Sequence, residues 1–220
     1  MTARGRIAFD ELIRFDRLRC APPVRTLAGV DEAGRGALAG PVVAAAVVCE
    51  PCEALSRVRD SKLVSERERE RLRDLIVERC AALGIGVVEP GEIDRMNILR
   101  ATLEAMRAAI ENLSVAPDLV LVDGIHLPPA AYPAAAIPGG DRKSFVVAAA
   151  SIVAKVARDR IMRERAAVFH GYGFTSNKGY GTREHIEAIR RNGRTEFHRM
   201  SFRIREQLRL EWGGGGPDKR

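Results

Sequence analysis

Cysteine and tryptophan are scarce in this chain, whose 220 residues include four cysteines and one tryptophan. Cys49 and Cys52 form a single C-x-x-C pair, and no second pair follows at the spacing of a zinc ribbon. The four histidines are scattered and do not complete a site of two cysteines and two histidines. The sequence therefore favours free thiols, packed as small apolar groups, over a structural zinc site.

Long apolar runs are also missing. The best candidate, residues 37–49, is too short to cross a bilayer and contains Pro41. Basic and acidic residues alternate near the N-terminus, where a signal peptide would need an apolar core. These observations predict a cytoplasmic protein with no membrane partner.

Charge of one sign is in excess. Lysine and arginine number 36 against 29 acidic residues, which gives a formal net charge of +7. Such a balance favours a polyanionic partner, although many basic proteins bind none. Hydrophobic residues make up 46% of the chain and charged residues 30%, as expected for a globular domain with its own core.

The order of apolar segments and turn residues predicts an α/β fold. Three early strands are expected to pair in an antiparallel way, and a crossover helix leads to the fourth. Small residues crowd the first half of the longest predicted helix, which would let it approach the sheet closely. The predicted strands are 26–30, 42–49, 85–88, 118–122 and 134–137, and the main predicted helices are 9–19, 65–79, 92–113, 145–170 and 183–191.

Four carboxylates stand where such a fold places its sites. Asp31 and Glu32 are neighbours on the first strand, so their side chains can share a metal only where the strand ends and twists. Asp123 closes another strand, and Asp141 precedes the longest helix. Oxygen ligands from separate segments suit Mg²⁺ or Mn²⁺, and two such ions can hydrolyse a phosphodiester. Each acid taken alone is more often a turn or helix cap, so the prediction rests on their convergence.

Short blocks stand in order along the chain at 29–36, 38–45, 60–63, 122–124, 140–141, 148–160, 172–174, 177–182 and 198–202. Together they resemble bacterial ribonuclease HII. The resemblance covers about residues 27–202, and it implies a ribonuclease H-like fold with a mixed five-stranded sheet and a helical C-terminal extension. It also implies hydrolysis of RNA paired with DNA and incision 5′ to single ribonucleotides embedded in duplex DNA, leaving 3′-hydroxyl and 5′-phosphate ends.

The resemblance also assigns roles to single residues. It makes Asp31, Glu32, Asp123 and Asp141 the catalytic carboxylates, which hold two Mn²⁺ or Mg²⁺ ions. Tyr180 would stack on the deoxyribose that follows the ribonucleotide, although a tyrosine that seals a loop is the alternative. Candidates for phosphate contacts, each equally compatible with a solvated face, are Lys62, Lys143, Ser144, Lys155 and Lys178.

A glycine-arginine-glycine loop follows the first two acids. The resemblance implies that Gly34, Arg35 and Gly36 read the 2′-hydroxyl at an RNA–DNA junction. Glycines permit close backbone approach, and backbone amides and carbonyls can pair with a hydroxyl. Taken without its neighbours, the loop is more often an ordinary tight turn. Ala37 stands where the family usually has proline, so the loop exit is expected to be less rigid.

The expected organisation is a helical arm over 1–25, a catalytic domain over 26–205 and a flexible tail over 206–220. Gln207 to Trp212 resembles a short peptide that binds the bacterial sliding clamp, although a frayed helix end is the plainer interpretation. We expect a monomer. Two other functions compete with the nuclease: a non-catalytic duplex-binding protein, and an Mg²⁺-dependent phosphohydrolase that acts on small phosphates.

Overall fold

A mixed five-stranded sheet forms the centre of the protein in a computed structural model that describes residues 3–129 and 131–204. The strand order is β3-β2-β1-β4-β5. β1 pairs with β2 and β2 with β3 in an antiparallel way, whereas β1–β4 and β4–β5 are parallel. The predicted fold class is thus confirmed. The strands are β1 (Leu27–Ala33), β2 (Val42–Val48), β3 (Ala82–Val88), β4 (Leu119–Asp123) and β5 (Ala134–Ile137).

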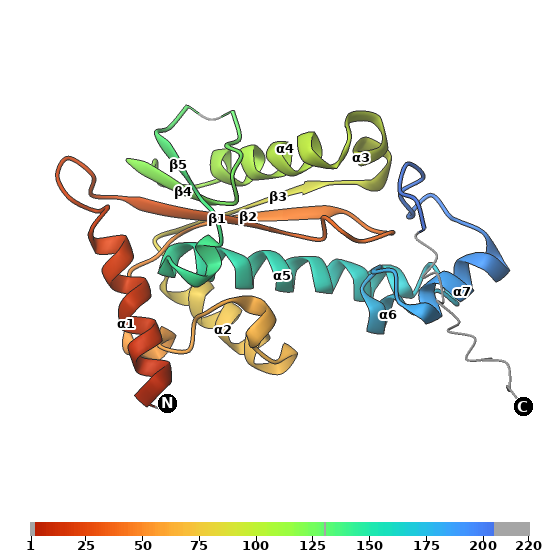
Figure 1. Cartoon of the computed structure of the whole chain (residues 1–220), viewed down its shortest axis with the longest axis horizontal. Coiled ribbons are helices and arrows are strands. Elements are labelled where there is room, and N and C mark those ends of the chain that lie inside the picture. Colours follow the sequence, from red (N-terminus) through yellow and green to blue (C-terminus); the bar gives the residue numbers. More distant parts are fainter. Residues whose placement is uncertain (1–2, 130, 205–220) are drawn as a thin grey trace, which may run out of the picture.

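Helices cover both faces of the sheet (Figure 1). α4 lies over one face, and α5 lies over the other with α2 behind it. α6 and α7 gather at the C-terminal end of α5. The helices are α1 (Ala3–Arg17), α2 (Glu66–Arg79), α3 (Pro90–Met96), α4 (Ile98–Glu111), α5 (Phe145–Ala166), α6 (Phe174–Asn177) and α7 (Arg183–Asn192), with short 3-10 turns η1 (Glu53–Leu55), η2 (Ser61–Leu63) and η3 (Gly140–Arg142).

Alternation along the strands divides the core into two layers. Ala28 and Val30 of β1 pack into the layer beneath α4, whereas Leu27 and Ala33 pack into the layer beneath α5. Gly29 lets α5 approach, because a Cβ atom there would lie 2.2 Å from the backbone carbon of Val146. The close approach of α5 fixes this helix against the strand that carries Asp31 and Glu32.

Several predicted boundaries are wrong in detail: α1 already starts at Ala3, β1 continues to Ala33, and three further differences have a clear local cause. The helix expected over 92–113 is two helices, because Asn97 adopts a φ of 73° and caps α4 through the amides of Leu99 (3.0 Å) and Arg100 (3.1 Å). The longest helix ends at Ala166, ahead of a turn that leads to Gly171 with a φ of 83°. The third strand starts earlier than expected, because Ala82 already pairs with Val48 of β2.

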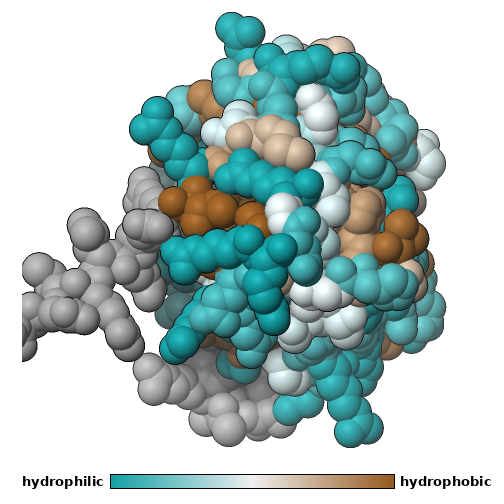
Figure 2. Space-filling view, turned by 90° about the vertical axis from the view of Figure 1, so that its right-hand side faces the viewer, coloured by the Kyte–Doolittle hydropathy of each residue, from teal (hydrophilic) through white to brown (hydrophobic). Residues whose placement is uncertain are grey.

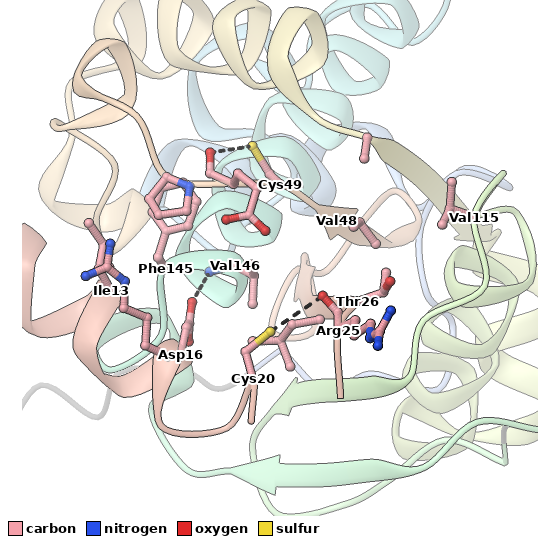
Figure 3. A pocket seen from close by; sticks show the side chains of 15 residues that line it. Ile13, Asp16, Cys20, Arg25, Thr26, Val48, Cys49, Val115, Phe145 and Val146 are labelled. Carbon is pink, nitrogen blue, oxygen red and sulfur yellow. Dashed lines mark hydrogen bonds between the residues drawn. The ribbon is translucent and has the colours of Figure 1, made fainter. Parts of the chain in front are cut away.

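The first helix packs against the start of α5. The Phe9 and Phe145 rings meet edge to face at 5.8 Å, and the Asp16 carboxylate accepts a hydrogen bond from the Val146 amide at 3.0 Å (Figure 3). A hollow of about 380 Å³ lies beside this contact, at the start of β1. The carboxylates of interest lie toward the other end of that strand, so this hollow is separate from them.

No helix within residues 3–129 and 131–204 is both long and apolar enough to cross a membrane. The proposed clamp-binding segment, Gln207 to Trp212, lies outside the described residues.

Candidate metal centre

Three of the four predicted carboxylates meet at one point. β1 pairs with β4 in parallel register up to Val30 and Val122, so the following residues, Asp31 and Asp123, lie side by side. One carboxylate oxygen from each of Asp31, Glu32 and Asp123 can be chosen so that all lie within 4.8 Å of one another. The structure therefore brings together residues that are 91 positions apart in sequence, from Glu32 to Asp123.

Asp31 and Glu32 share this point although they belong to opposite faces of β1. Asp31 approaches Ser151 of α5, whereas Glu32 lines a hollow of about 210 Å³ with Met106 of α4. Both residues lie within β1, which continues to Ala33, so the strand does not end at the pair as we had expected. The ladder with β4 stops instead, because β4 ends at Asp123, and the gap leaves room for Glu32 to converge on its neighbour.

The cluster carries negative charge with little compensation. Burial raises the pKa of Asp31 well above its usual value, and the charges of Glu32 and Asp123 raise it further. Burial also raises the pKa of Glu32, against the opposing effect of Arg35, whose Nη1 lies 3.2 Å from Oε1 of Glu32. A divalent cation would relieve this repulsion, and three carboxylate oxygens are a hard donor set suited to Mg²⁺ or Mn²⁺.

Asp141 lies next to the cluster but outside the set of three. It belongs to η3, whose Gly140 amide donates a 2.6 Å hydrogen bond to Oδ1 of Asp123. Burial raises the pKa of Asp141, and Asp60 and Asp123 raise it further. Nζ of Lys62 lies 3.6 Å from its Oδ2. The carboxylate is thus positioned beside the cluster, with a lysine as its ionic partner.

The glycine-arginine-glycine loop projects beside these acids. Gly34 has a φ of 98°, and its carbonyl accepts a hydrogen bond from the Ala37 amide at 3.2 Å, so the loop is a tight turn. Arg35 and Gly36 are exposed, and a Cβ atom on Gly36 would meet open space. Ala37 is fully buried. The exposed tip is thereby free to meet a ligand.

Tyr180 reaches the same region from a distant part of the chain. The amide of Leu38 donates to the Gly179 carbonyl at 2.8 Å, which joins the turn before Tyr180 to the glycine-arginine-glycine loop. The Tyr180 ring is half-buried, with the Arg158 guanidinium carbon 5.2 Å from its centre. The loop and the tyrosine that were predicted to act together are therefore neighbours.

The candidate phosphate contacts divide into outward and inward side chains. Lys62 is exposed beside Asp141, and exposed Lys143 donates to the Pro138 carbonyl at 2.7 Å. Lys155 pairs with Asp159 at 2.6 Å. Lys178 is buried and pairs with Glu66 at 3.4 Å. Ser144 is fully buried and caps α5 through the Val147 amide at 3.3 Å.

Several residues at the site were not singled out from the sequence. The hydroxyls of Ser61 and Ser151 lie 3.0 Å apart and connect η2 to the Asp31 side of α5. His126 lines the hollow next to Glu32. The only signal for the two serines was their place in the matched blocks, and nothing in the pattern of the sequence marked His126 as part of the site.

Comparison with known proteins decides which family this geometry represents. A model of the family described as Ribonuclease HII matches residues 28–205. The chain belongs to the ribonuclease HII family. It is therefore a metal-dependent endoribonuclease of the ribonuclease H type. Ribonuclease HII of Lachnoclostridium phytofermentans is 50% identical over 82% of this chain and 71% of its own length. Ribonuclease HII of Syntrophus aciditrophicus is 49% identical over 87% of this chain and 90% of its own length.

Solved structures of ribonucleases HII share the fold. Ribonuclease H2 of Pyrococcus horikoshii superposes with a TM-score of 0.68 and 28% identity, covering 81% of this chain and 94% of that one. Ribonuclease HII of Archaeoglobus fulgidus, solved in complex with PCNA, superposes with a TM-score of 0.69 and 27% identity. The match covers 83% of this chain and 97% of that one. Both cover nearly all of the neighbour's chain, so the sheet and its helices here are the shared catalytic fold.

Proposed function

We propose that this ribonuclease HII cuts the RNA strand of RNA/DNA hybrids and incises duplex DNA on the 5′ side of a single embedded ribonucleotide. The observation that carries the proposal is the position of the exposed Arg35–Gly36 tip directly beside the convergent carboxylates of Asp31, Glu32 and Asp123. A loop that contacts one sugar can thereby define which neighbouring phosphodiester meets the acidic cluster.

Asp31, Glu32 and Asp123 would hold a divalent cation, and Asp141 lies close enough to contribute to a second. Bound Mg²⁺ or Mn²⁺ supplies activation of a water molecule and stabilisation of the leaving oxygen, with 3′-hydroxyl and 5′-phosphate products. Asp31 and Asp141 are both buried. Lys62, which pairs with Asp141, is placed to contact a phosphate of the bound strand.

Recognition of the junction would be divided between two loops. Backbone groups of Gly34, Arg35 and Gly36 can donate to and accept from a 2′-hydroxyl, and Gly36 leaves room for close approach. The Tyr180 ring can pack on a sugar that lacks this hydroxyl. Exposed Lys143 would add sequence-independent attraction to phosphates, whereas Lys155 and buried Lys178 are paired with Asp159 and Glu66. The surface at the α6–α7 end of the molecule is mainly hydrophilic (Figure 2).

A substrate panel tests the proposal. The protein is incubated with DNA duplexes that contain one ribonucleotide, with uniform RNA/DNA hybrids and with small phosphate esters, each with and without Mn²⁺ or Mg²⁺. We expect metal-dependent cleavage of both nucleic acids. Binding without cleavage would favour a non-catalytic duplex-binding protein, and hydrolysis of small esters alone would favour a general phosphohydrolase.

We also propose, from sequence alone, that Gln207 to Trp212 binds the sliding clamp. The PCNA complex of the Archaeoglobus fulgidus relative gives a precedent for clamp binding in that protein. Deletion of residues 207–220 should abolish retention of the clamp in a pull-down experiment. Failure of the intact protein to retain the clamp would contradict the proposal.

A further inference from the structure

Two fully buried arginines lie beneath the proposed reading loops. The guanidinium of Arg158, on α5, donates to three backbone carbonyls: Nε to Pro41 at 2.9 Å, Nη1 to Lys178 at 2.9 Å and Nη2 to Ala39 at 3.1 Å. One side chain therefore joins the segment after the glycine-arginine-glycine loop to the turn that leads into Tyr180.

Arg199 holds the other side of the same loop. Its Nε donates to the Gly40 carbonyl at 3.0 Å and its Nη1 to the Arg35 carbonyl at 2.9 Å. Its backbone amide donates to the Leu38 carbonyl at 2.9 Å. The Arg35 carbonyl belongs to the loop tip, so Arg199 contacts the backbone of the very turn that is proposed to read the 2′-hydroxyl.

Neither guanidinium forms an ion pair with a carboxylate of the described residues. Within residues 3–129 and 131–204, no carboxylate lies within ion-pair distance of Arg158 or Arg199, although both side chains are fully buried. Burial lowers the pKa of both, and that of Arg199 falls to about 9. Burying two cations without a carboxylate partner costs desolvation free energy. The role of these arginines is therefore to bind the backbone carbonyls around them.

The planar fork of arginine suits this task. The N–H groups of a guanidinium point in fixed, diverging directions. One side chain can therefore donate to carbonyls of several segments that do not pair with one another as β-strands. Gly34 is packed onto Arg158 so tightly that a Cβ atom there would lie 2.0 Å from Nε. The tip of the loop, its exit and the Tyr180 turn are thus fixed relative to one another from below.

We infer that Arg158 and Arg199 are positioning residues, which lock the Arg35–Gly36 tip and Tyr180 into one rigid junction-reading unit. This inference rests on the proposed function. The two arginines touch neither the carboxylate cluster nor the exposed surface, so they act through the loops. Their loss should change which substrates are cut more than how the metal ions are bound.

The test replaces each arginine by lysine, which keeps the charge but loses the fork. Initial rates are measured for a duplex with one ribonucleotide and for a uniform RNA/DNA hybrid. For Arg158→Lys and Arg199→Lys, we expect incision at the single ribonucleotide to fall about 10- to 100-fold, as for a misplaced reactive geometry. The hybrid rate should fall much less, because a hybrid offers a ribose at every register.

Arg160→Lys is the matched control, since Arg160 lies on the same helix but pairs with Glu70 at 2.6 Å near the surface. Its two rates should equal those of the unmodified protein. The Mn²⁺ concentration for half-maximal activity should also be unchanged in the Arg158 and Arg199 variants. Equal losses on both substrates, or wild-type rates on both, would overturn the inference. A wild-type enzyme that does not cut at the embedded ribonucleotide would instead refute the proposed function.

Hydrogen exchange in the unmodified protein provides a test that does not depend on the variants folding. The amides of Leu38, Ala39 and Gly40 donate to carbonyls of the neighbouring segments, at distances of 2.8 to 3.2 Å. We expect them to exchange as slowly as the amides of β1, with the protein free of substrate. Exchange as fast as that of the exposed Gly36 amide would show that the loop is not held, and would contradict the inference.

Discussion

Two groups of like charge lie a short distance apart in this protein, and they are stabilised in opposite ways. The carboxylates of Asp31, Glu32 and Asp123 converge with Arg35 as their main cationic neighbour, and burial raises the pKa of Asp31 and Glu32. The guanidiniums of Arg158 and Arg199 are also buried without an ion-pair partner among the described residues, but backbone carbonyls surround them.

The difference separates a binding site from a scaffold. Backbone carbonyls pair with all three nitrogens of Arg158 and with Nε and Nη1 of Arg199, and only Nη2 of Arg199 is buried without a partner among the described residues. That region is therefore held together almost entirely from within the protein. The acidic region becomes electrostatically favourable only when a cation binds. We expect changes to the acidic cluster to abolish activity at little cost in stability, and changes to the arginines to lower stability and disturb specificity.

The largest expected effect comes from removing a carboxylate charge. Asp31→Asn and Asp123→Asn should each lower the cleavage rate at least about 10³-fold in saturating Mn²⁺, a loss on the scale seen for catalytic groups elsewhere. Initial rates on a labelled hybrid give the measurement. Asp118→Asn is a control, because Asp118 caps the start of β1 through the Arg25 and Thr26 amides, far from the cluster. Near-normal activity of Asp31→Asn would remove that residue from the catalytic set.

Removal of a buried guanidinium should lower the stability of the fold. Arg158→Met leaves three buried carbonyls without their donor, at about 1–3 kcal/mol each, partly offset by the loss of a buried charge. We expect a net loss of roughly 3 kcal/mol, which lowers Tm by about 6–12 °C in thermal unfolding. Arg183→Met should change Tm little, since that side chain is 88% exposed. A Tm for Arg158→Met within a degree of the wild type would contradict the scaffold role.

A buried histidine pair beside the arginines should make stability depend on pH. The Thr195 amide donates to Nδ1 of His198 at 3.0 Å, so the proton of a neutral His198 is on Nε2, where it faces Nε2 of His185 at 3.2 Å. His185 in turn can donate from Nδ1 to the Tyr180 carbonyl at 2.9 Å. A proton added to His185 would point at the Nε2–H of His198, and one added to His198 would point at the Thr195 amide, so both contacts need neutral rings.

Burial, with the neighbouring His185, lowers the pKa of His198 to about 4. The unfolded state binds a proton near pH 6.5, so stability should be lost as the pH falls from about 6.5 to 4, by roughly 3 kcal/mol. Urea unfolding across this range measures the slope. His198→Asn should flatten it and His170→Asn, at an exposed position, should not. An equal slope in His198→Asn and the wild type would show that the pair does not titrate in this way.

The smallest predicted effect has the opposite sign. Because the folded state raises the pKa of Asp31, its contribution to stability is lost as the pH rises above the unfolded value of about 3.9. Without divalent metal at pH 7, Asp31→Asn should therefore raise Tm by a small amount, because the variant removes a buried charge that has no cation to balance it. The gain should vanish near pH 4, where the wild-type carboxyl is protonated. A lower Tm for Asp31→Asn at pH 7 would contradict the idea of an uncompensated cluster.

The order of the elements could be predicted from the sequence because apolar periodicity and turn residues are local. The break at Asn97 could not, since Ile93, Met96, Leu99 and Leu103 continue one helical stripe across it. The stripe is nearly continuous, and the cap that divides it depends on a single side chain. Periodicity alone therefore joined two helices into one.

The site residues could likewise be predicted only where the signal was local. Asp31, Glu32 and Asp123 were chosen for their places at strand ends and in family motifs, and the parallel register of β1 and β4 explains why they meet. Ser144 and Lys178 were chosen from the same motifs, yet the structure buries both. Arg158 lies in a matched block too, but its burial beneath distant carbonyls depends on long-range packing that no local pattern reveals.

The central claim is that the loop at Gly34 to Gly36 selects the phosphodiester that the carboxylates cut. The most direct test maps the incision, at single-nucleotide resolution, in an end-labelled DNA duplex with one ribonucleotide and Mn²⁺. We predict one cut, immediately 5′ to the ribonucleotide, with a 3′-hydroxyl on the upstream fragment. Cuts spread along the DNA, or a single cut at a different distance from the ribonucleotide, would contradict the account.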